Sequence, residues 1–268
     1  MSLVRRRRTT HAGLEGACLA EGPELSIIIP AFNEEQRLPA TIAAVRAWLD
    51  RAALAAELIL VDDGSADATG EIVAAAAAAD PRLVPVINPV NVGKGHAIVT
   101  GVARSRGAQV VFFDADLSYD LAYIDDARRH LGDGADVVVG ARDLATSDSR
   151  RDYGLSRRLA SGAFNRYVDL MLGLGVPDTQ CGFKAFRGDV ARPLFAALTV
   201  GGFGFDVELL FVARRWGLRI DRIPVAMTAR GGSSVSVVRH SLGMARDVWS
   251  IRRRGERGRY PDPPTRDR

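Results

Sequence analysis

The chain has 268 residues, of which 47% are hydrophobic and 25% are charged, a composition typical of an ordinary globular protein with one large domain. No apolar stretch reaches the roughly 18–20 residues that span a bilayer, so the sequence predicts no membrane-spanning helix. The two cysteines, Cys18 and Cys181, exclude a disulfide framework and favour a reducing compartment.

Positive charge is concentrated at the two ends of the chain. Arg5–Arg8 contribute +4, and residues 252–268 contribute another +4 from seven arginines against three acidic residues. Because the whole chain carries +4, residues 9–251 sum to −4. We expect basic, disordered tails at residues 1–22 and 256–268, which would be attracted to an anionic membrane surface or to nucleic acid.

Apolar runs alternate with helical patterns through the first half of the chain. The apolar runs predict strands at residues 25–30, 57–62, 83–88, 109–114 and 136–139. The helical patterns predict helices at 38–49, 69–79, 94–106 and 122–131. Asn33 is expected to cap the first helix, and Ser65 or Asp67 the second. This alternation predicts an α/β fold with a mostly parallel central sheet flanked by helices.

The second half is less regular. Residues 142–155 are polar and suit an active-site loop. Beyond them we expect a helix at 156–172, a strand at 181–186, a helix at 206–216, a strand at 218–227 and an amphipathic helix at 238–253. Because no linker divides the chain, we expect a single domain at residues 23–237, followed by a basic amphipathic helix and tail at 238–268.

Two carboxylates stand one residue apart at the end of a predicted buried strand. The motif Asp114-Ala115-Asp116 directly follows the apolar run Val110–Phe113. The two negative charges repel each other, and burial increases that cost. A divalent metal removes the repulsion and prefers oxygen ligands. The motif therefore predicts a metal–phosphate site at the carboxyl edge of the sheet, where open α/β folds bind ligands.

Polar and small residues also follow the other predicted strands. A parallel sheet places all such loops at one edge. Glycines there permit close backbone approach, and a lysine supplies positive charge for a phosphate. The residues are Phe32, Asn33 and Glu34 after the first strand, Asp62, Asp63, Gly64 and Ser65 after the second, and Asn91, Gly93, Lys94 and Gly95 after the third.

Other nucleotide and metal motifs do not fit the sequence. Asn88 stands where a P-loop needs its first glycine, and no Ser or Thr follows Lys94. No Gly-x-Gly-x-x-Gly follows the first strand, which argues against a dinucleotide-binding oxidoreductase. The four histidines are too sparse for a zinc site.

Several segments together resemble family 2 glycosyltransferases of the A-type fold. Those shared with the whole family are Ile27–Glu35, Val61–Ser65, Asn91–Gly95 and Asp114–Asp116. Two further segments, Asp178–Lys184 and Phe205–Leu210, are similar to dolichyl-phosphate glucosyltransferases and their bacterial polyprenyl-phosphate relatives. The resemblance covers residues 24–237. It implies inverting transfer of a hexose from a nucleotide sugar to a polyprenyl phosphate.

The resemblance also implies roles on the donor side. It favours UDP-glucose, with GDP-mannose and other hexosyl donors as alternatives, and a Mg²⁺ or Mn²⁺ cofactor on the diphosphate. The metal ligands would be Asp114 and Asp116. The nucleotide-sugar contacts would come from Pro30, Phe32, Glu34, Asp62, Asp63, Gly93, Lys94, Asp114, Ala115 and Asp116.

On the acceptor side, the resemblance implies arginines that hold one anion beside another. A phosphate monoester is already a nucleophile near neutral pH, because its second pKa is about 6, so a strong base is less necessary. The residues implied at the reacting centre are Arg142, Arg157, Ser161 and Asp178. Asp206 and Glu208 are expected to support the site and Cys181 to pack in the core.

The chain departs from its relatives at three points. Ser118 stands where some relatives have a glutamine ligand, and Gly232–Ser236 lacks the lysine of a segment linked to the diphosphate. Relatives often have transmembrane helices. Here we expect a cytoplasmic protein, held peripherally on the cytoplasmic face of a membrane by the helix at 238–254 and by Arg5–Arg8.

Two alternatives remain open at this point. One is a related transferase with a soluble acceptor, although the arginines of segment 142–161 suit an anionic acceptor. The other is a nucleic-acid-binding module that uses the basic ends. Those ends lack interleaved aromatic residues, so we expect no specific nucleic-acid partner.

Overall fold

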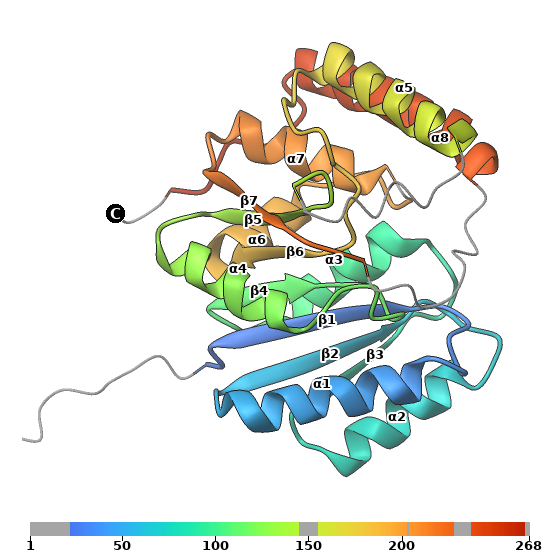
Figure 1. Ribbon diagram of the computed structural model, residues 1–268, viewed down its shortest axis with the longest axis vertical. Coiled ribbons are helices and arrows are strands. Elements are labelled where there is room, and N and C mark those ends of the chain that lie inside the picture. The colour runs from blue at the N-terminus through green and yellow to red at the C-terminus, as the bar shows by residue number, and fades with distance from the viewer. Residues whose placement is uncertain (1–21, 145–154, 203, 228–236, 266–268) are drawn as a thin grey trace, which may run out of the picture.

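Within the residues that the computed structural model describes (22–144, 155–202, 204–227 and 237–265, with side chains left out at 155–161 and 237–242), a seven-stranded sheet has the order β3-β2-β1-β4-β6-β5-β7 (Figure 1). All pairs are parallel except those of β6, which is antiparallel to β4 and β5. The strands are β1 Leu25–Ala31, β2 Ala56–Asp62, β3 Leu83–Ile87, β4 Gln109–Phe112, β5 Val137–Ala141, β6 Lys184–Arg187 and β7 Ile220–Pro224.

Helices cover both faces of this sheet (Figure 1). One face carries α1 Leu38–Ala52, α2 Thr69–Ala79 and α4 Ala122–Gly132, and the other carries α3 Lys94–Arg104, α6 Gly188–Ala196 and α7 Phe205–Arg215. Two further helices, α5 Leu155–Leu172 and α8 Val237–Glu256, lie side by side beyond α7. No helix among the described residues combines the length and apolar character needed to cross a bilayer.

The alternation of side chains along the strands divides the core into two layers. On β1, Ile27 and Ile29 pack against α1 and its neighbours, while Ile28 points to the opposite layer. All three side chains are fully buried. The continuous apolar strands are therefore explained by burial on both faces, as in other parallel sheets. The predicted mostly parallel sheet with helices on both sides is confirmed.

The structure differs from the sequence prediction around β6. The strand expected at 181–186 is Lys184–Arg187, and it runs antiparallel between two parallel neighbours. The helix α6 that follows it was not predicted, because Pro193 lies inside it and proline normally ends a helical pattern. Its apolar face, which includes Leu194 and Phe195, is nevertheless buried in the core. Tertiary packing therefore outweighs the local preference here.

The N-cap positions of the first two helices are occupied by Arg37 and Ala68 rather than by the predicted residues. Helix α1 begins only at Leu38, and Asn33, with a φ of 54°, lies well before it. The Asn33 side-chain oxygen instead accepts from the backbone N–H of Ala66 at 2.9 Å, which ties the loop after β1 to the loop after β2. Ser65 donates its hydroxyl to Asp62 rather than capping α2. Asp67 accepts from the N–H of Thr69, the first residue of α2, at 3.0 Å.

The segment after α8 folds back onto the core. Tyr260 is buried, and its hydroxyl donates to Glu208 Oε1 at 2.8 Å. The indole N–H of Trp216 donates to the carbonyl of Pro261 at 2.9 Å. The expectation of a disordered tail from residue 256 is therefore wrong for this segment. The other expected tail falls on residues 1–22, nearly all of which lie outside the described part of the chain.

Candidate active site

Asp114 and Asp116 lie just beyond β4, at the carboxyl edge of the parallel strands. Asp114 Oδ1 lies 2.5 Å from the ammonium of Lys94, the first residue of α3. Asp116 Oδ1 accepts from the backbone N–H of Ser118 at 3.0 Å. Thr41 of α1 holds the turn between the two carboxylates by donating its hydroxyl to the carbonyl of Ala115 at 2.5 Å. The motif is thus presented in a fixed turn.

Glu34 adds negative charge to this corner from the loop after β1. Burial raises the pKa of Glu34; Arg37 opposes this, and the charges of Asp116 and Asp114 add to it. Mutual repulsion of this kind is relieved by a cation. Lys94 supplies one: burial works against its charged form, but the charges of Asp114 and Asp206 raise its pKa overall. The corner therefore attracts positive charge.

Asp63 anchors the loop that leads into α3. Its Oδ2 accepts from the N–H of Gly93 at 2.8 Å, and its Oδ1 accepts from the side chain of Asn88 at 2.9 Å. Gly93 has a φ of 109°, a conformation that other residues rarely adopt. Gly64 lets this loop approach the turn after β2, since a Cβ there would lie 2.5 Å from the backbone of Val90. Sequence reasoning missed this anchoring role of Asp63 and Asn88.

The other residues predicted to contact the nucleoside line the same edge. Asp62 is buried at the end of β2, and one of its oxygens accepts from the N–H of Ser65 at 3.1 Å. Pro30 is half-buried near the end of β1, and Phe32 beyond it is 45% exposed. The loop before α3 also exposes Val92. An exposed apolar wall beside carboxylates is a suitable surface for a base and its ribose.

Arg142 and Asp178 form a buried, bidentate ion pair. Arg142 follows β5, and its Nη2 and Nε lie 2.6 and 2.8 Å from the two oxygens of Asp178. The backbone N–H of Arg142 also donates to Asp178, at 3.0 Å. Burial alone would raise the pKa of Asp178, but the Arg142 hydrogen bonds hold it below its ordinary value. Both oxygens of Asp178 are therefore engaged in holding Arg142.

Tyr119 and Cys181 link this ion pair to the acidic corner. The thiol of Cys181 lies 3.4 Å from the Tyr119 hydroxyl in a buried contact. Burial raises the pKa of Tyr119, on which Cys181, Arg142 and Asp114 also act electrostatically. Burial likewise raises the pKa of the Cys181 thiol, which packs as expected. The buried contact between Tyr119 and Cys181 had no signal in the sequence beyond the nearness of Tyr119 to Asp116.

Lys184 and Asp206 form a second buried ion pair. Their charged atoms are 2.5 Å apart, and both side chains are almost fully buried. The Lys184 ammonium also donates to the carbonyl of Cys181 at 2.8 Å. Glu208, on the same turn of α7, instead accepts from Thr199 and from Tyr260. Asp206 therefore faces the site, while Glu208 faces the segment after α8.

Gly182 fits closely against Asp114. A Cβ at residue 182 would lie 2.4 Å from Asp114 Oδ2, so a methyl group there must displace the carboxylate. For the metal site that the sequence predicts at Asp114, we expect Gly182→Ala to weaken Mn²⁺ binding about 10-fold or more, because metal sites tolerate little displacement of their ligands. The matched control is Gly132→Ala at the end of α4, where a Cβ would meet nothing within 4 Å. Calorimetric titration with MnCl₂ measures both, and equal affinities would contradict this packing argument.

Some predicted residues fall outside the described part of the structure. Arg157 and Ser161 lie on α5, but their side chains are not described. The expected active-site loop 142–155 is described as far as Leu144 and again from Leu155, and the segment Gly232–Ser236 is not described. The described residues that the fold brings together at one edge are Pro30, Phe32, Glu34, Asp62, Asp63, Gly93, Lys94, Asp114, Ala115, Asp116, Arg142 and Asp178.

Comparison with known proteins shows the family to which the chain belongs. Residues 26–195 match the family described as Glycosyl transferase family 2. The chain is a family 2 glycosyltransferase. It is 34% identical over 245 residues to the dolichyl-phosphate beta-glucosyltransferase of Drosophila melanogaster, covering 85% of this chain and 74% of that protein. The corresponding protein of Dictyostelium discoideum is 32% identical over 242 residues, covering 85% and 73%.

Solved structures share the fold of this family 2 glycosyltransferase. Mannosyl-3-phosphoglycerate synthase from Rubrobacter xylanophilus matches 91% of this chain and 77% of its own, with a TM-score of 0.66 and 18% identity. Glucosyl-3-phosphoglycerate synthase from Mycobacterium tuberculosis, in complex with Mn²⁺, UDP and glucosyl-3-phosphoglycerate, matches 90% and 82%, with a TM-score of 0.62 and 25% identity. These likenesses confirm the predicted A-type glycosyltransferase fold.

The acidic corner of this glycosyltransferase fits a divalent cation. The Lys94 ammonium lies 2.5 Å from Asp114, so this corner already binds one positive charge. In the part of the chain that the structure describes, no group of three or more His, Cys, Asp or Glu side chains is arranged to hold a metal unaided. Asp114 and Asp116 would therefore need water, or oxygens of a bound phosphate ligand in its place, to complete the six oxygen ligands that Mg²⁺ prefers.

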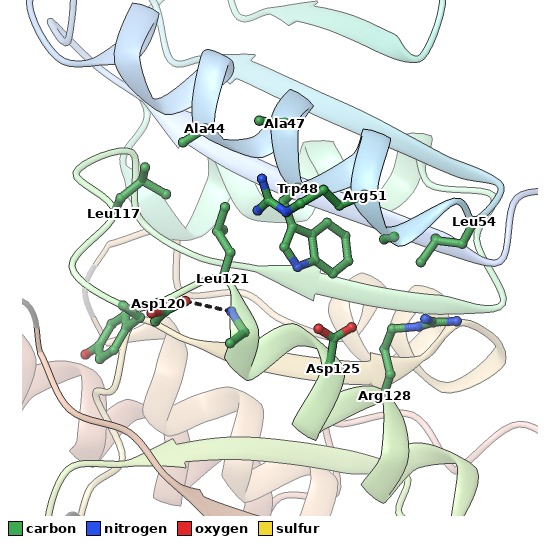
Figure 2. Close-up of a pocket in the computed structure, with 13 residues that line it drawn as sticks. Ala44, Ala47, Trp48, Arg51, Leu54, Leu117, Asp120, Leu121, Asp125 and Arg128 are labelled. Atoms are coloured by element: carbon green, nitrogen blue, oxygen red, sulfur yellow. Dashed lines mark hydrogen bonds between the residues drawn. The ribbon is translucent and has the colours of Figure 1, made fainter.

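A separate pocket of about 650 Å³ lies between α1 and α4 (Figure 2). Trp48 and Leu121 give it apolar walls, with Arg51 at its rim. The Asp120 carboxylate there accepts from the N–H of Ala122 at 2.9 Å at the start of α4. The pocket shares no residue with the predicted donor and acceptor sets, so it is distinct from the candidate active site.

Proposed function

We propose that this protein transfers glucose from UDP-glucose to a polyprenyl, dolichyl-type phosphate with inversion at the anomeric carbon. The observation that carries the proposal is the identity of 32–34% with dolichyl-phosphate beta-glucosyltransferases over 85% of the chain. In this reaction an oxygen of the acceptor phosphate bonds to the anomeric carbon from the face opposite UDP. The bond to the diphosphate breaks, and UDP leaves with the electron pair.

The donor would lie along the carboxyl edge of β1 to β4. A Mg²⁺ or Mn²⁺ ion on Asp114 and Asp116 would stabilise the negative charge that develops on the leaving diphosphate. Lys94 would contribute its charge at the N-terminus of α3, a position that favours anions. The proposed nucleoside contacts are Pro30, Phe32, Glu34 and Asp62, with Asp63 and Gly93 shaping the adjoining loop.

The acceptor phosphate would meet Arg142. Its guanidinium is planar and suited to phosphate, and Asp178 fixes its orientation through two side-chain hydrogen bonds. Because both Asp178 oxygens are engaged, we assign Asp178 the role of orienting Arg142 rather than that of a general base. We propose that Arg157 and Ser161 complete the contacts with the acceptor phosphate.

A donor screen tests this function. The protein would be incubated with a short polyprenyl phosphate, MgCl₂ or MnCl₂, and UDP-glucose, GDP-mannose or other nucleotide sugars in turn. Mass spectrometry would measure the lipid-linked sugar and the released nucleoside diphosphate. We expect lipid-dependent release of UDP from UDP-glucose. Lipid-dependent release of GDP from GDP-mannose would support the polyprenyl phosphate as acceptor but identify mannose as the transferred sugar.

The likeness to glucosyl-3-phosphoglycerate synthase favours one second candidate, a soluble acceptor that carries a phosphate. Arg142 would recognise such an acceptor by the same chemistry. The same screen with 3-phosphoglycerate in place of the lipid separates the two. Transfer to 3-phosphoglycerate without transfer to the lipid would overturn the polyprenyl-phosphate proposal and keep the donor site.

Because a polyprenyl phosphate resides in a membrane, we also propose peripheral attachment to the cytoplasmic face through α5 and α8. These two helices lie side by side at one end of the molecule (Figure 1). Leu170 on α5 is 81% exposed and Trp249 on α8 is 53% exposed, which is unfavourable in water. The guanidinium of Arg253 lies 5.0 Å from the centre of the Trp249 ring. Exposed apolar side chains beside arginines suit an anionic lipid surface.

Liposome flotation tests this attachment. We expect Leu170→Ser combined with Trp249→Ser to reduce binding to anionic vesicles about 10-fold or more, because burying each side chain contributes about 1.5–3 kcal/mol. The control is Ile87→Ser at the end of β3, which removes a side chain of similar exposure, 52%, from a different surface. Equal binding to neutral and anionic vesicles, unchanged in the double variant, would rule out the proposed surface.

A further inference from the structure

Four charged side chains of alternating sign run from the acidic corner into the core. Asp114 contacts Lys94 at 2.5 Å, and Asp206 contacts Lys184 at 2.5 Å. Lys94 also interacts electrostatically with Asp206, which joins the two pairs. Asp114 is one-third exposed and Lys94 about one-fifth, whereas Lys184 and Asp206 are buried. The series thus begins where a ligand can reach it and ends where a ligand cannot.

Close backbone packing holds Lys94 beside Asp206. Lys94 begins α3, and Asp206 lies in the first turn of α7. A Cβ at Gly95 would lie 2.7 Å from the Cβ of Phe205, so the two helix N-termini touch. The position of Asp206 at a helix N-terminus also favours its negative charge. The two helix ends therefore keep this carboxylate within reach of the Lys94 ammonium.

Lys184 cannot take over the role of Lys94. Its ammonium is committed to Asp206 and to the carbonyl of Cys181, and it lies 5.7 Å from the centre of the Phe112 ring. Its side chain has no exposure to solvent. Lys94, in contrast, has a flexible four-carbon stem that is partly exposed, so its ammonium can pivot between two carboxylates.

We propose that Lys94 is the resident counter-ion of the cation site, and that Asp206 is the positioning residue that receives Lys94 when a divalent cation binds Asp114 and Asp116. The inference rests on the cation of the proposed function. A divalent ion on Asp114 repels an ammonium at hydrogen-bonding distance from the same carboxylate. Asp206 offers the displaced ammonium a second negative partner, which lowers the free-energy cost of moving Lys94 away from Asp114.

Binding of MnCl₂ to the full chain without nucleotide, measured by calorimetry or by the electron paramagnetic resonance of free Mn²⁺, tests this exchange. We expect Lys94→Met to bind Mn²⁺ about 5-fold or more tightly than the native protein, because no ammonium competes for Asp114. The same variant is expected to bind UDP with Mn²⁺ more weakly, because a positive charge near the diphosphate is lost. A purely structural role would not change the two affinities in opposite directions.

Asp206→Asn is expected to weaken Mn²⁺ binding about 5-fold or more, because Lys94 then has Asp114 as its remaining partner. In the Lys94→Met background the same change should have no effect on Mn²⁺ affinity. Glu208→Gln is the matched control on the same turn of α7; its carboxylate faces Thr199 and Tyr260, and we expect native Mn²⁺ affinity. Asp206→Asn alone leaves Lys184 buried without its ionic partner. The double variant Asp206→Asn with Lys184→Met removes that lysine as well, and we expect it to weaken Mn²⁺ binding to the same extent.

Three outcomes would overturn the proposal. One is unchanged or weaker Mn²⁺ binding in Lys94→Met, and another is an Asp206→Asn effect of equal size with and without Lys94. The third is the absence of Mn²⁺ binding to the native protein. The proposed function is tested separately by the donor screen. If the variants show the predicted Mn²⁺ affinities but the donor screen shows no glucosyl transfer, the ion exchange is supported and the proposed reaction is wrong.

Discussion

Replacing Asp116 by Asn is expected to reduce the turnover of sugar transfer about 100- to 1,000-fold or more, while the fold survives. The proposed cation needs the negative charge of Asp116, which Asn lacks. The hydrogen bond from the N–H of Ser118 needs an oxygen, which Asn retains. The change therefore removes the charge and keeps the geometry of the turn.

Asp120→Asn is a matched control for this prediction. Asp120 lies in the same loop, and its Oδ1 accepts from the N–H of Ala122 at 2.9 Å, as Asp116 accepts from Ser118. It faces the pocket between α1 and α4 rather than the acidic corner (Figure 2). UDP release would be measured across a MnCl₂ titration, with circular dichroism as the check on folding. Retained metal-dependent turnover in Asp116→Asn would remove this residue from the proposed metal site.

The parts of this fold that depend on neighbouring residues could be predicted from the sequence. Buried parallel strands are continuous apolar runs, so Leu25–Ala31 and Ala56–Asp62 were recognisable to within one or two residues. The carboxyl ends of such strands lie together by topology, which placed Asp114 and Asp116 beside Lys94 before any distance was known. An apolar run followed by a polar loop can be recognised from neighbouring residues alone, without knowledge of distant contacts.

Long-range pairing was not accessible in this way. Asn33 and Ala66 are 33 residues apart, and nothing in a turn sequence says whether an asparagine caps its own helix or bonds to a neighbouring loop. Lys184 ends the segment Asp178–Lys184 that resembles the glucosyltransferases, yet it is buried against Asp206, 22 residues away. A lysine in an apolar strand shows that a partner must exist, because an unpaired buried charge is costly. It does not identify that partner.

Asp178→Asn is expected to lower the free energy of unfolding by about 3–5 kcal/mol, because it leaves the Arg142 guanidinium buried without a charged partner. Asp178 is 5% and Arg142 19% exposed, so solvent offers little compensation. The control is Glu256→Gln, which removes a carboxylate that is 59% exposed and paired with the 46% exposed Arg252. Exposed pairs contribute about 0–1 kcal/mol, so we expect a small loss there.

The pH dependence of unfolding separates the loss of this ion pair from a general packing defect. Arg142 holds the pKa of Asp178 below its ordinary value of about 3.9, so its contribution is fully present above that pH. It is lost as the pH falls through the lower, folded-state pKa. Urea denaturation at pH 7 and at decreasing pH should therefore show the native protein converging on Asp178→Asn in acid. A difference that stays constant down to acid pH would show that the charge of Asp178 does not stabilise the fold.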